Sequence, residues 1–415
     1  MRELVECWIG YVVQTKFNEI MSLKSFLYNH SPQCLKDYRK KLLTSPYPIV
    51  KNPNEVFNKV YKVKEETWED SYYPECYGLC KEQHLVIKDK KRYIYSADNA
   101  IAVMSSDAII TSHGVYWDKF NDEEFCTWAS PDDANIYWFN HQCVGLRRFK
   151  KKECIPGKTF SMVGVWSFHW GHCMYQFMPK LFSAGEAGLL NQDITILVDA
   201  NEDGTIMEII KEYLKYFPNA KIKKAYPKIE YLCETLYFMD SCGSNFNNCK
   251  FRLDYPYFIP RHALDKIQKY VIDPLIEKVK DNKPTYDKIF LPRGHFRTLT
   301  NYEEVHNYFK KQGFVDLEGS NLTLEQKADY FYHAKEIVGL YGSAFLNLMF
   351  CNKAKSMVLI NYKMSTDTSL YLQIRDHVAD LVNVTGQDDS EWYHSNYYIP
   401  LEKIKKVYNE RIATK

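Results

Sequence analysis

The 415-residue sequence lacks the short motifs of several common enzyme classes. It has no GxGxxG fingerprint and no P-loop lysine, which disfavours dinucleotide-dependent dehydrogenases and P-loop nucleotidases. It has no GxSxG nucleophile elbow, which disfavours an α/β-hydrolase. No Asp-x-Asp pair occurs, so the manganese clamp of one large class of sugar-transfer enzymes is absent. A partial match to an EF-hand loop at Asp199 has Ile210 at the position of the required glutamate, and it is interpreted as a turn.

Long apolar runs, a large net charge and CxxC cysteine pairs are also missing. The longest early apolar run, residues 7–13, is too short to span a membrane and does not have a signal-peptide layout. The net charge of +2 argues against a nucleic-acid coat and against a polybasic membrane anchor. The 12 cysteines form no CxxC pair, so we expect reduced thiols and no metal site. The sequence therefore predicts a cytoplasmic protein without a nucleic-acid partner or a transmembrane segment, and it leaves the oligomeric state open.

Three regions are expected along the chain. Residues 1–90 mix polar and aromatic residues without a chemical motif, and we predict an irregular, mostly helical extension of mixed α/β character. Residues 91–280 begin with short β-like runs and continue as alternating strands and helices, with a buried strand at 194–198 and an amphipathic helix after it. Residues 281–415 begin at a linker, 281–284, and repeat this alternation. Two such sets predict two doubly wound α/β domains that face a cleft.

Helix boundaries in the last region are predicted from local motifs. Thr300 with Glu303 and Thr323 with Gln326 have capping-box spacing, so each pair is expected to open a helix. Further elements are expected as a strand at 337–340, a helix at 344–351, a strand at 357–361 and a helix at 368–379. Before this region, a helical connector at 262–279 is expected to be interrupted by Pro274.

Two features at predicted strand ends are suited to phosphate. Arg293 and Arg297 follow an apolar strand and precede a helix, and guanidinium groups bind phosphate oxygens in a bidentate manner. Gly339, Gly342 and Ser343 form a small-residue turn between a strand and a helix, where backbone N–H groups can face an anion. The alternative interpretations are surface arginines and a tightly packed turn. The two features together favour a nucleotide-dependent enzyme.

A third cluster contains two histidines three residues apart. His169 and His172 lie among Trp166 and Trp170, an arrangement suited to a proton acceptor beside a stacked sugar. The alternative is a buried structural histidine at the start of a helix. A zinc pair would need further ligands, and no residue stands at a convincing spacing.

These clusters, in this order, resemble glycosyltransferase family 61 over residues 99–362. The resemblance is carried by four stretches: 99–117, 172–181, 291–305 and 338–350. The sequence departs from the family pattern at three places. Gln176 stands where an acidic residue is usual, Tyr302 stands where Glu often follows Asn, and Tyr341 precedes Gly-Ser where His-Gly-Ala is usual.

The resemblance implies a GT-B type α/β fold, with two Rossmann-like domains at 91–280 (acceptor) and 281–415 (nucleotide sugar). It implies inverting, metal-independent transfer from a nucleotide sugar, UDP-linked, to a glycan or glycoconjugate hydroxyl, without another cofactor. His172 is the expected base, with His169 as its rival, and Arg293 and Arg297 are expected on the diphosphate. The remaining expected nucleotide-site residues are Gly342, Ser343, Ala344 and Asn347, with Asn301 and Glu304 holding the arginine loop. A sugar-nucleotide epimerase or hydrolase, or an inactive nucleotide-binding protein, is the alternative.

Overall fold

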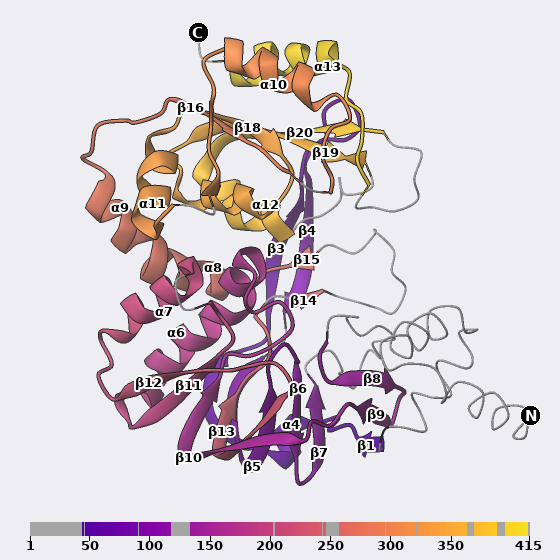
Figure 1. The fold of residues 1–415 in the computed structure, drawn as a ribbon, viewed down its shortest axis with the longest axis vertical. Coiled ribbons are helices and arrows are strands. Elements are labelled where there is room, and N and C mark those ends of the chain that lie inside the picture. Colours follow the sequence, from indigo (N-terminus) through magenta and orange to yellow (C-terminus); the bar gives the residue numbers. More distant parts are fainter. Residues whose placement is uncertain are drawn as a thin grey trace, which may run out of the picture.

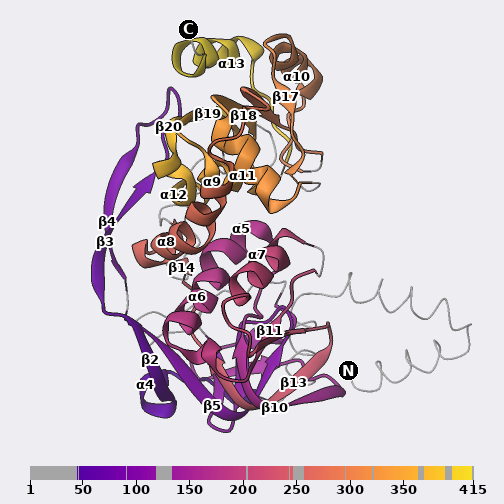
Figure 2. The ribbon, with the colours of Figure 1, turned by 90° about the vertical axis from the view of Figure 1, so that its left-hand side faces the viewer.

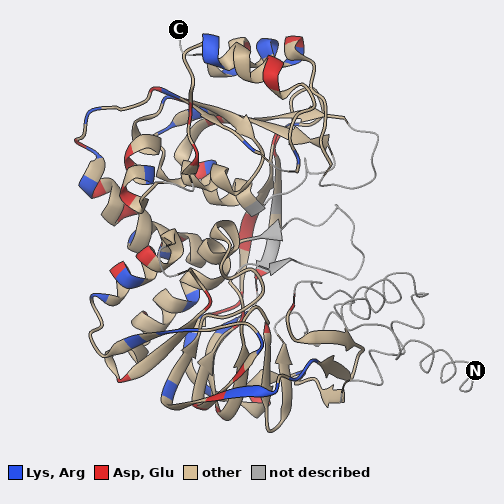
Figure 3. Cartoon of the chain, viewed as in Figure 1, with Lys and Arg blue, Asp and Glu red and all other residues tan. Residues whose placement is uncertain are grey.

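The computed structural model describes residues 44–413 except 45, 90, 118–132, 202–203, 243, 246–256, 295, 320–321, 363–368 and 388–394. The protein is a mixed α/β fold, as predicted. Figure 1 shows a sheet in each half of the elongated molecule and a layer of helices between the two sheets. Acidic and basic residues are interspersed over both halves in this view (Figure 3), in agreement with the small net charge. Within the described residues, no helix is long and apolar enough to cross a membrane.

The first sheet has eight strands in the order β12-β11-β10-β13-β5-β6-β7, with β2 paired to β5. Its parallel part consists of β10 (Lys151–Ser161), β11 (Ile194–Val198), β12 (Ala220–Lys224) and β13 (Ile229–Phe238). Its antiparallel part consists of β2 (Asn58–Lys64), β5 (Arg92–Val103), β6 (Ala108–Thr111) and β7 (Gly114–Trp117). The chain moves from β10 through β11 to β12 and then returns to the other side of β10. The carboxyl ends of β10 and β13 therefore form a topological switch point.

The helices of the first half cover one face of this sheet. They are α5 (Trp170–His172), a π-helical turn (Cys173–Phe177), α6 (Met178–Glu186), a 3₁₀ turn (Leu189–Asn191) and α7 (Thr205–Leu214). Ile206, Ile209 and Ile210 lie on the buried face of α7, as the helical spacing predicts. The predicted strand 194–198 and the helix after it are both confirmed.

The second sheet has five parallel strands in the order β17-β16-β18-β19-β20. The strands are β16 (Lys288–Leu291), β17 (Val315–Asp316), β18 (Glu336–Leu340), β19 (Ala354–Asn361) and β20 (Val378–Gly386). One face packs against α10 (Tyr302–Lys311), α13 (Leu401–Val407) and the π turn Tyr408–Ile412. The other face packs against α11 (Leu324–His333), the 3₁₀ helix Ser343–Phe350 and α12 (Ser369–Ile374). The sheet is doubly wound, and its switch point lies between β16 and β18.

One hydrophobic core joins the two halves. It includes Ile196 of the first sheet and Ile337 of the second, together with the helices between them. The connecting helix runs from α8 (Arg261–Ile267) through a π turn (Gln268–Ile272) into α9 (Asp273–Val279). The prediction that Pro274 interrupts this helix is wrong. Pro274 stands in the first turn of α9, and the preceding π turn absorbs the missing N–H.

A long β-hairpin lies along one side of the molecule and connects the two halves (Figure 2). We call this hairpin the strap; it consists of β3 (Thr67–Tyr73) and β4 (Gln83–Asp89). Near its tip, the N–H of Tyr77 donates to the carbonyl of Asn383 in β20 at 2.9 Å, and the N–H of Asn383 donates to the carbonyl of Glu75 at 3.1 Å. The strap therefore starts at the first sheet and ends on the second.

The described part of the first 90 residues is mostly strand, so the prediction of a mostly helical segment is wrong there. Besides β2, β3 and β4, it contains β1 (Pro46–Pro48) and one short helix, α4 (Pro53–Val56). β1 pairs with β9 (Cys143–Leu146), which pairs with β8 (Ile136–Phe139). A further small ribbon is formed by β14 (Ser244–Asn245) and β15 (Tyr257–Phe258). Most residues of β2 and β3 are at least partly exposed, so the sequence has no clear alternation of apolar and polar residues there.

Two further predictions in the second half need correction. α10 begins after Asn301, and the Thr300–Glu303 capping box does not form because Thr300 pairs with the carbonyl of Tyr397 instead. The helix expected at 368–379 ends earlier, as α12 and a 3₁₀ turn (Arg375–His377), because Val378 begins β20; residue 368 lies outside the described residues. The expected helix at 344–351 is present as a 3₁₀ helix. The capping box of Thr323 and Gln326 is confirmed.

Candidate functional site

The two predicted phosphate-binding features lie at neighbouring strand ends of the second sheet. Arg293 follows β16 and Gly342 follows β18, and these parallel strands pair with Leu291 opposite Gly339. β16 and β18 flank the switch point, where the flanking connections leave toward opposite faces and open a crevice at the carboxyl ends. The fold therefore brings together two features that lie about fifty residues apart in the sequence.

Arg293 is half-buried and is held by two backbone carbonyls. Its Nε donates to the carbonyl of Phe296 at 2.8 Å, and its Nη1 donates to the carbonyl of Tyr341 at 3.1 Å. A Cβ atom on Gly342 would lie 2.0 Å from Nη1, so only glycine leaves room for the guanidinium here. Glycine stands at position 342 because the side chain of Arg293 approaches the backbone closely there.

Arg297 stands in an unusual backbone turn. Phe296 and Arg297 have φ angles of +45° and +52°, a region that side chains other than glycine rarely adopt. The guanidinium carbon of Arg297 lies 5.8 Å from the ring centroid of Tyr341. Its Nε is buried without a hydrogen-bond partner among the described residues. Strained turns of this kind cost about 1–3 kcal/mol and occur preferentially at functional sites.

The electrostatics of the arginine pair favour an anion. Burial, and secondarily the positive charge of Arg297, lower the pKa of Arg293. Two guanidinium groups that repel each other in a half-buried position are stabilised when a multiply charged anion binds between them. A diphosphate supplies that charge.

The 3₁₀ helix after Gly342 supplies backbone donors at the same place. Ser343 is exposed and Ala344 is partly exposed at its first turn, where N–H groups have no partner within the helix. Asn347 is buried in the second turn, and its Nδ2 donates to the carbonyl of Ala344 at 3.0 Å. The Oδ1 of Asn347 is buried without a hydrogen-bond partner among the described residues, so a donor from a ligand would satisfy it.

Asn301 and Glu304 belong to the support of the arginine segment. The Nδ2 of Asn301 donates to Glu304 Oε2 at 3.0 Å and to the carbonyl of Ile399 at 2.9 Å. Thr300 N–H donates to the carbonyl of buried Tyr397 at 2.8 Å. These bonds attach the segment that follows Arg297 to the segment that precedes α13.

The histidine cluster lies at the other switch point, after β10. Trp166 has a φ angle of +62°, and its ring centroid lies 4.7 Å from that of His172. The Nδ1 of His172 lies 2.8 Å from the hydroxyl of Tyr175 and 3.2 Å from Oε1 of Gln176. His169 precedes α5 as its N-cap residue and is exposed, with its ring 4.5 Å from that of Phe168. These contacts at Nδ1 and at the ring face orient the imidazole of His172.

The histidine turn and the glycine turn approach each other across the two halves. A Cβ atom on Gly171 would lie 4.0 Å from the Cβ atom of Ser343. Lys327 of α11 adds a second contact, with its Nζ 5.4 Å from the ring of Trp170 and 2.5 Å from the hydroxyl of Thr205. Burial lowers the pKa of Lys327. Lys327 was not found by sequence reasoning, because a lysine within an amphipathic helix gives no signal by itself.

Asp199 is a second residue that sequence reasoning missed. It directly follows β11, is only 3% exposed, and accepts hydrogen bonds from the hydroxyl of Ser167 and the N–H of Ser105. Burial raises its pKa to about 6. Through Ser167, Asp199 fixes the turn that carries Trp166. The sequence feature that could have identified Asp199 is its position directly after a buried strand, where ligand sites of α/β sheets lie. The partial match to an EF-hand loop led instead to its interpretation as a turn.

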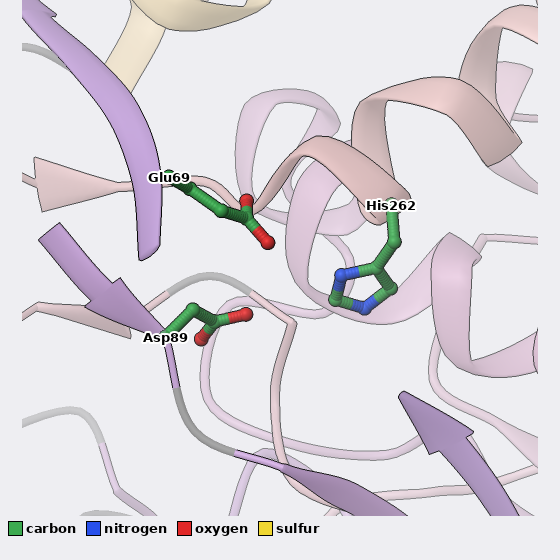
Figure 4. Close-up of side chains that lie close together, drawn as sticks. All are labelled: Glu69, Asp89 and His262. Carbon is green, nitrogen blue, oxygen red and sulfur yellow. The ribbon is translucent and has the colours of Figure 1, made fainter. Parts of the chain in front are cut away.

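Within the described residues, one group could be considered for a metal ion. Ligand atoms of Glu69, Asp89 and His262 lie within 4.8 Å of one another, and they come from β3, β4 and α8 (Figure 4). Lys64 Nζ, however, lies 2.5 Å from Glu69 and 2.6 Å from Asp89, and Arg92 pairs with Asp89 at 2.6 Å. Two cations already balance the two carboxylates, so a divalent ion would add uncompensated charge at a buried site. The cluster is an ion-pair network at the base of the strap.

The model of the glycosyltransferase 61 family matches residues 170–358. The matched region contains His172, both arginines and the glycine turn. It confirms the predicted resemblance for three of the four stretches, and the stretch 99–117 lies outside it. No curated protein matches the chain. The family match supports glycosyltransferase activity.

Proposed function

From the glycosyltransferase 61 match we infer that the protein transfers a sugar from a nucleotide sugar, UDP-linked, to a hydroxyl group of a glycan or glycoconjugate, with inversion at the anomeric carbon. The observation that carries this proposal is the placement of Arg293 and Arg297 beside the Gly342 turn at the switch point. The leaving group of such a reaction is a nucleoside diphosphate, and positive charge aimed at it stabilises the transition state.

The proposed reaction needs a proton acceptor on the opposite side of the sugar. The acceptor oxygen bonds to the anomeric carbon while the bond from that carbon to the diphosphate breaks, and the hydroxyl proton moves to a base. His172 is the proposed base because it is held in one orientation and its helix adjoins Ser343. We further propose a GT-B type arrangement, in which 91–280 contributes the acceptor side and 281–415 holds the nucleotide.

Metal independence is part of the proposal. The arginine pair supplies the charge that a divalent ion supplies in other sugar-transfer enzymes. Transfer is therefore expected to continue in EDTA at its full rate. Loss of activity in EDTA that manganese or magnesium restores would contradict this part.

The first experiment is a thermal-shift measurement with UDP, GDP, CDP and CMP. A ligand that binds the folded state raises the apparent melting temperature by mass action, and UDP is expected to give the largest shift. Arg293→Ala and Arg297→Ala should remove the shift and lower the transfer rate by about 10²–10³-fold. Lys283→Ala removes an exposed positive charge from the linker and serves as the control, with no change expected.

Three results would contradict the proposal. If both arginine variants keep the nucleotide shift and the transfer rate, the diphosphate binds elsewhere. If the protein consumes the donor equally well without any acceptor, an epimerase or hydrolase replaces the transferase. Nucleotide binding without transfer to any glycan acceptor would favour an inactive nucleotide-binding protein.

A further inference from the structure

Two side chains that follow His172 on the same helical segment face its imidazole. His172 is the last residue of α5, and the π-helical turn Cys173–Phe177 follows directly. The hydroxyl of Tyr175 and Oε1 of Gln176 lie 2.8 Å and 3.2 Å from Nδ1 of His172. Both side chains are buried, at 3% and 6% exposure, so their positions are fixed by the core. Turns of this π type are frequent at functional sites.

The contact with Gln176 selects one form of the neutral ring. The amide oxygen of glutamine can accept a hydrogen bond but cannot donate one. A proton on Nδ1 satisfies the contact, whereas a lone pair on Nδ1 would face the lone pairs of the oxygen. The hydroxyl oxygen of Tyr175 can share the same proton as a second acceptor. A neutral imidazole with its proton on Nδ1 carries its lone pair on Nε2.

We propose that Gln176 is a positioning residue that keeps the proton of His172 on Nδ1, so that Nε2 takes the proton of the acceptor hydroxyl. The catalytic part of this inference rests on the proposed function. In that step, the acceptor oxygen forms the glycosidic bond and the electron pair of the broken bond leaves with the diphosphate. The hydroxyl proton moves to Nε2, and the ring becomes a cation.

An amide differs from the acidic residue that family members usually carry at this position. A carboxylate at 176 would also hold Nδ1–H, but its charge would favour the protonated imidazolium. The amide selects the tautomer without adding charge, so the lone pair stays available at lower pH. The other titratable groups near His172 in the described part of the chain include Tyr175 and Cys173 on the π turn and His169 at the N-cap of α5. Asp199 reaches this region through Ser167, and Lys327 reaches it through Trp170.

Nitrogen NMR tests the tautomer without any need for activity. The protein is labelled with ¹⁵N-histidine, and the signals of His172 are identified by their loss in His172→Ala. The wild type should show the Nδ1–H tautomer at neutral pH. Gln176→Met should switch the ring to Nε2–H, because Tyr175 can then donate its hydroxyl proton to Nδ1. Tyr175→Phe is the matched control, and it should keep Nδ1–H.

Kinetics test the consequence for transfer. Gln176→Met should lower kcat by about 10–100-fold with unchanged UDP affinity, because fewer molecules carry the lone pair on Nε2. Gln176→Glu should keep the Nδ1–H tautomer and reach the wild-type kcat, but only at higher pH. The acid limb of its kcat profile should lie about one pH unit higher than that of the wild type, because the carboxylate favours the imidazolium.

Three outcomes would overturn the inference. An Nε2–H tautomer in the wild type removes its basis, even if every variant at 176 fails to fold. A tautomer switch in Tyr175→Phe but not in Gln176→Met assigns the role to Tyr175. If His172→Ala transfers sugar at the wild-type rate while the arginine variants do not, the catalytic part fails and the nucleotide site stands.

Discussion

Position 342 illustrates how one side chain of the site restricts another residue. The guanidinium of Arg293 occupies the space that any Cβ atom on residue 342 would need, with a distance of 2.0 Å. The atom in the way is the end of a flexible side chain, so a larger residue displaces the guanidinium without disrupting the core. Under the proposed function, the requirement for glycine at this position would therefore serve nucleotide binding.

Gly342→Ala should therefore weaken nucleotide binding with little change in stability. We expect a loss of about 10–100-fold in UDP affinity, because the displaced guanidinium loses a charge-assisted contact. Isothermal titration calorimetry measures the affinity, and thermal unfolding without ligand measures the stability. Gly294→Ala is the matched control in the same loop, because a Cβ atom there meets nothing within 4 Å. Equal affinities for both variants would contradict the contact.

Asp199 makes stability depend on pH in a direction opposite to that of most carboxylates. Its pKa is about 6 in the fold and 3.8 in the reference state. Between these values the folded protein binds more protons than the unfolded chain, so the free energy of unfolding falls as pH rises from about 4 to about 6. Above pH 6 the full cost of burying the charge is present, on the order of 3 kcal/mol.

Asp199→Asn should abolish this contribution. The free energy of unfolding of the variant, relative to the wild type, should rise with pH between about 4 and 6 and then level off. Urea unfolding of both proteins at several pH values measures this difference in the free energy of unfolding. The test is its change with pH, since the altered hydrogen bonds add only a contribution that does not depend on pH. Asp193→Asn, at a largely exposed carboxylate paired with Lys221, should show no such trend. Parallel curves for wild type and Asp199→Asn would contradict the assignment.

At the scale of elements, the alternating strands and helices of both halves followed from the sequence. The strand Ile194–Val198 and the 357–361 segment within β19 are continuous apolar runs covered on both faces, a strong signal. The strap gave no such signal, because most residues of β3 are at least partly exposed and its partners lie far away in the sequence. The sequence predicted that Arg293 and the Gly342 turn lie at strand ends, because strand ends are visible locally, and the structure confirms these positions. The positions of Lys327 and Asp199 beside the histidine turn were not predicted, because they arise from contacts between distant segments.

The two predicted capping boxes, of which only the one at Thr323 forms, allow a matched test of this local motif. Thr323 accepts from the N–H of Gln326 at 3.2 Å, whereas Thr300 caps no helix. Thr323→Ala should destabilise the start of α11 by about 1 kcal/mol, and Thr300→Ala should have a smaller effect. Hydrogen exchange of the first-turn amides of α11 and α10 measures both changes. Equal increases in exchange at the two helix starts would show that both threonines act as caps.

At the scale of the whole molecule, the strap connects the halves in addition to the shared core and the helix of α8 and α9. Glu82 near its tip pairs with Arg375 through two hydrogen bonds of 2.9 Å and accepts from the hydroxyl of Tyr371. Glu75 pairs with Arg411 at 3.0 Å. The base of the strap is fixed by the network of Lys64, Asp89 and Arg92. The strap is thus anchored by charge at both ends.

Glu82→Gln should loosen the tip of the strap. Both partners are about a third exposed, so screening limits the expected loss to about 1 kcal/mol. Hydrogen exchange of β3 and β4 should be faster in the variant than in the wild type. High salt should speed the exchange of the wild type more than that of the variant, because salt screens the ion pair that only the wild type has. Glu65→Gln removes an exposed ion pair with Lys62 near the base of the strap and should leave the exchange unchanged. Equal exchange in Glu82→Gln and wild type would show that the ion pair does not hold the tip.

The strap also affects the order in which the chain folds during its synthesis on the ribosome. Glu75 and its partner Arg411 are separated by 336 residues. At translation rates of about 5–20 residues per second, the hairpin waits roughly 20–70 s for this partner. During that time β3 and β4 pair only with each other. The acidic and basic residues along these strands oppose association with other nascent chains. A hairpin that leaves the ribosome early is therefore among the last elements to complete its tertiary contacts.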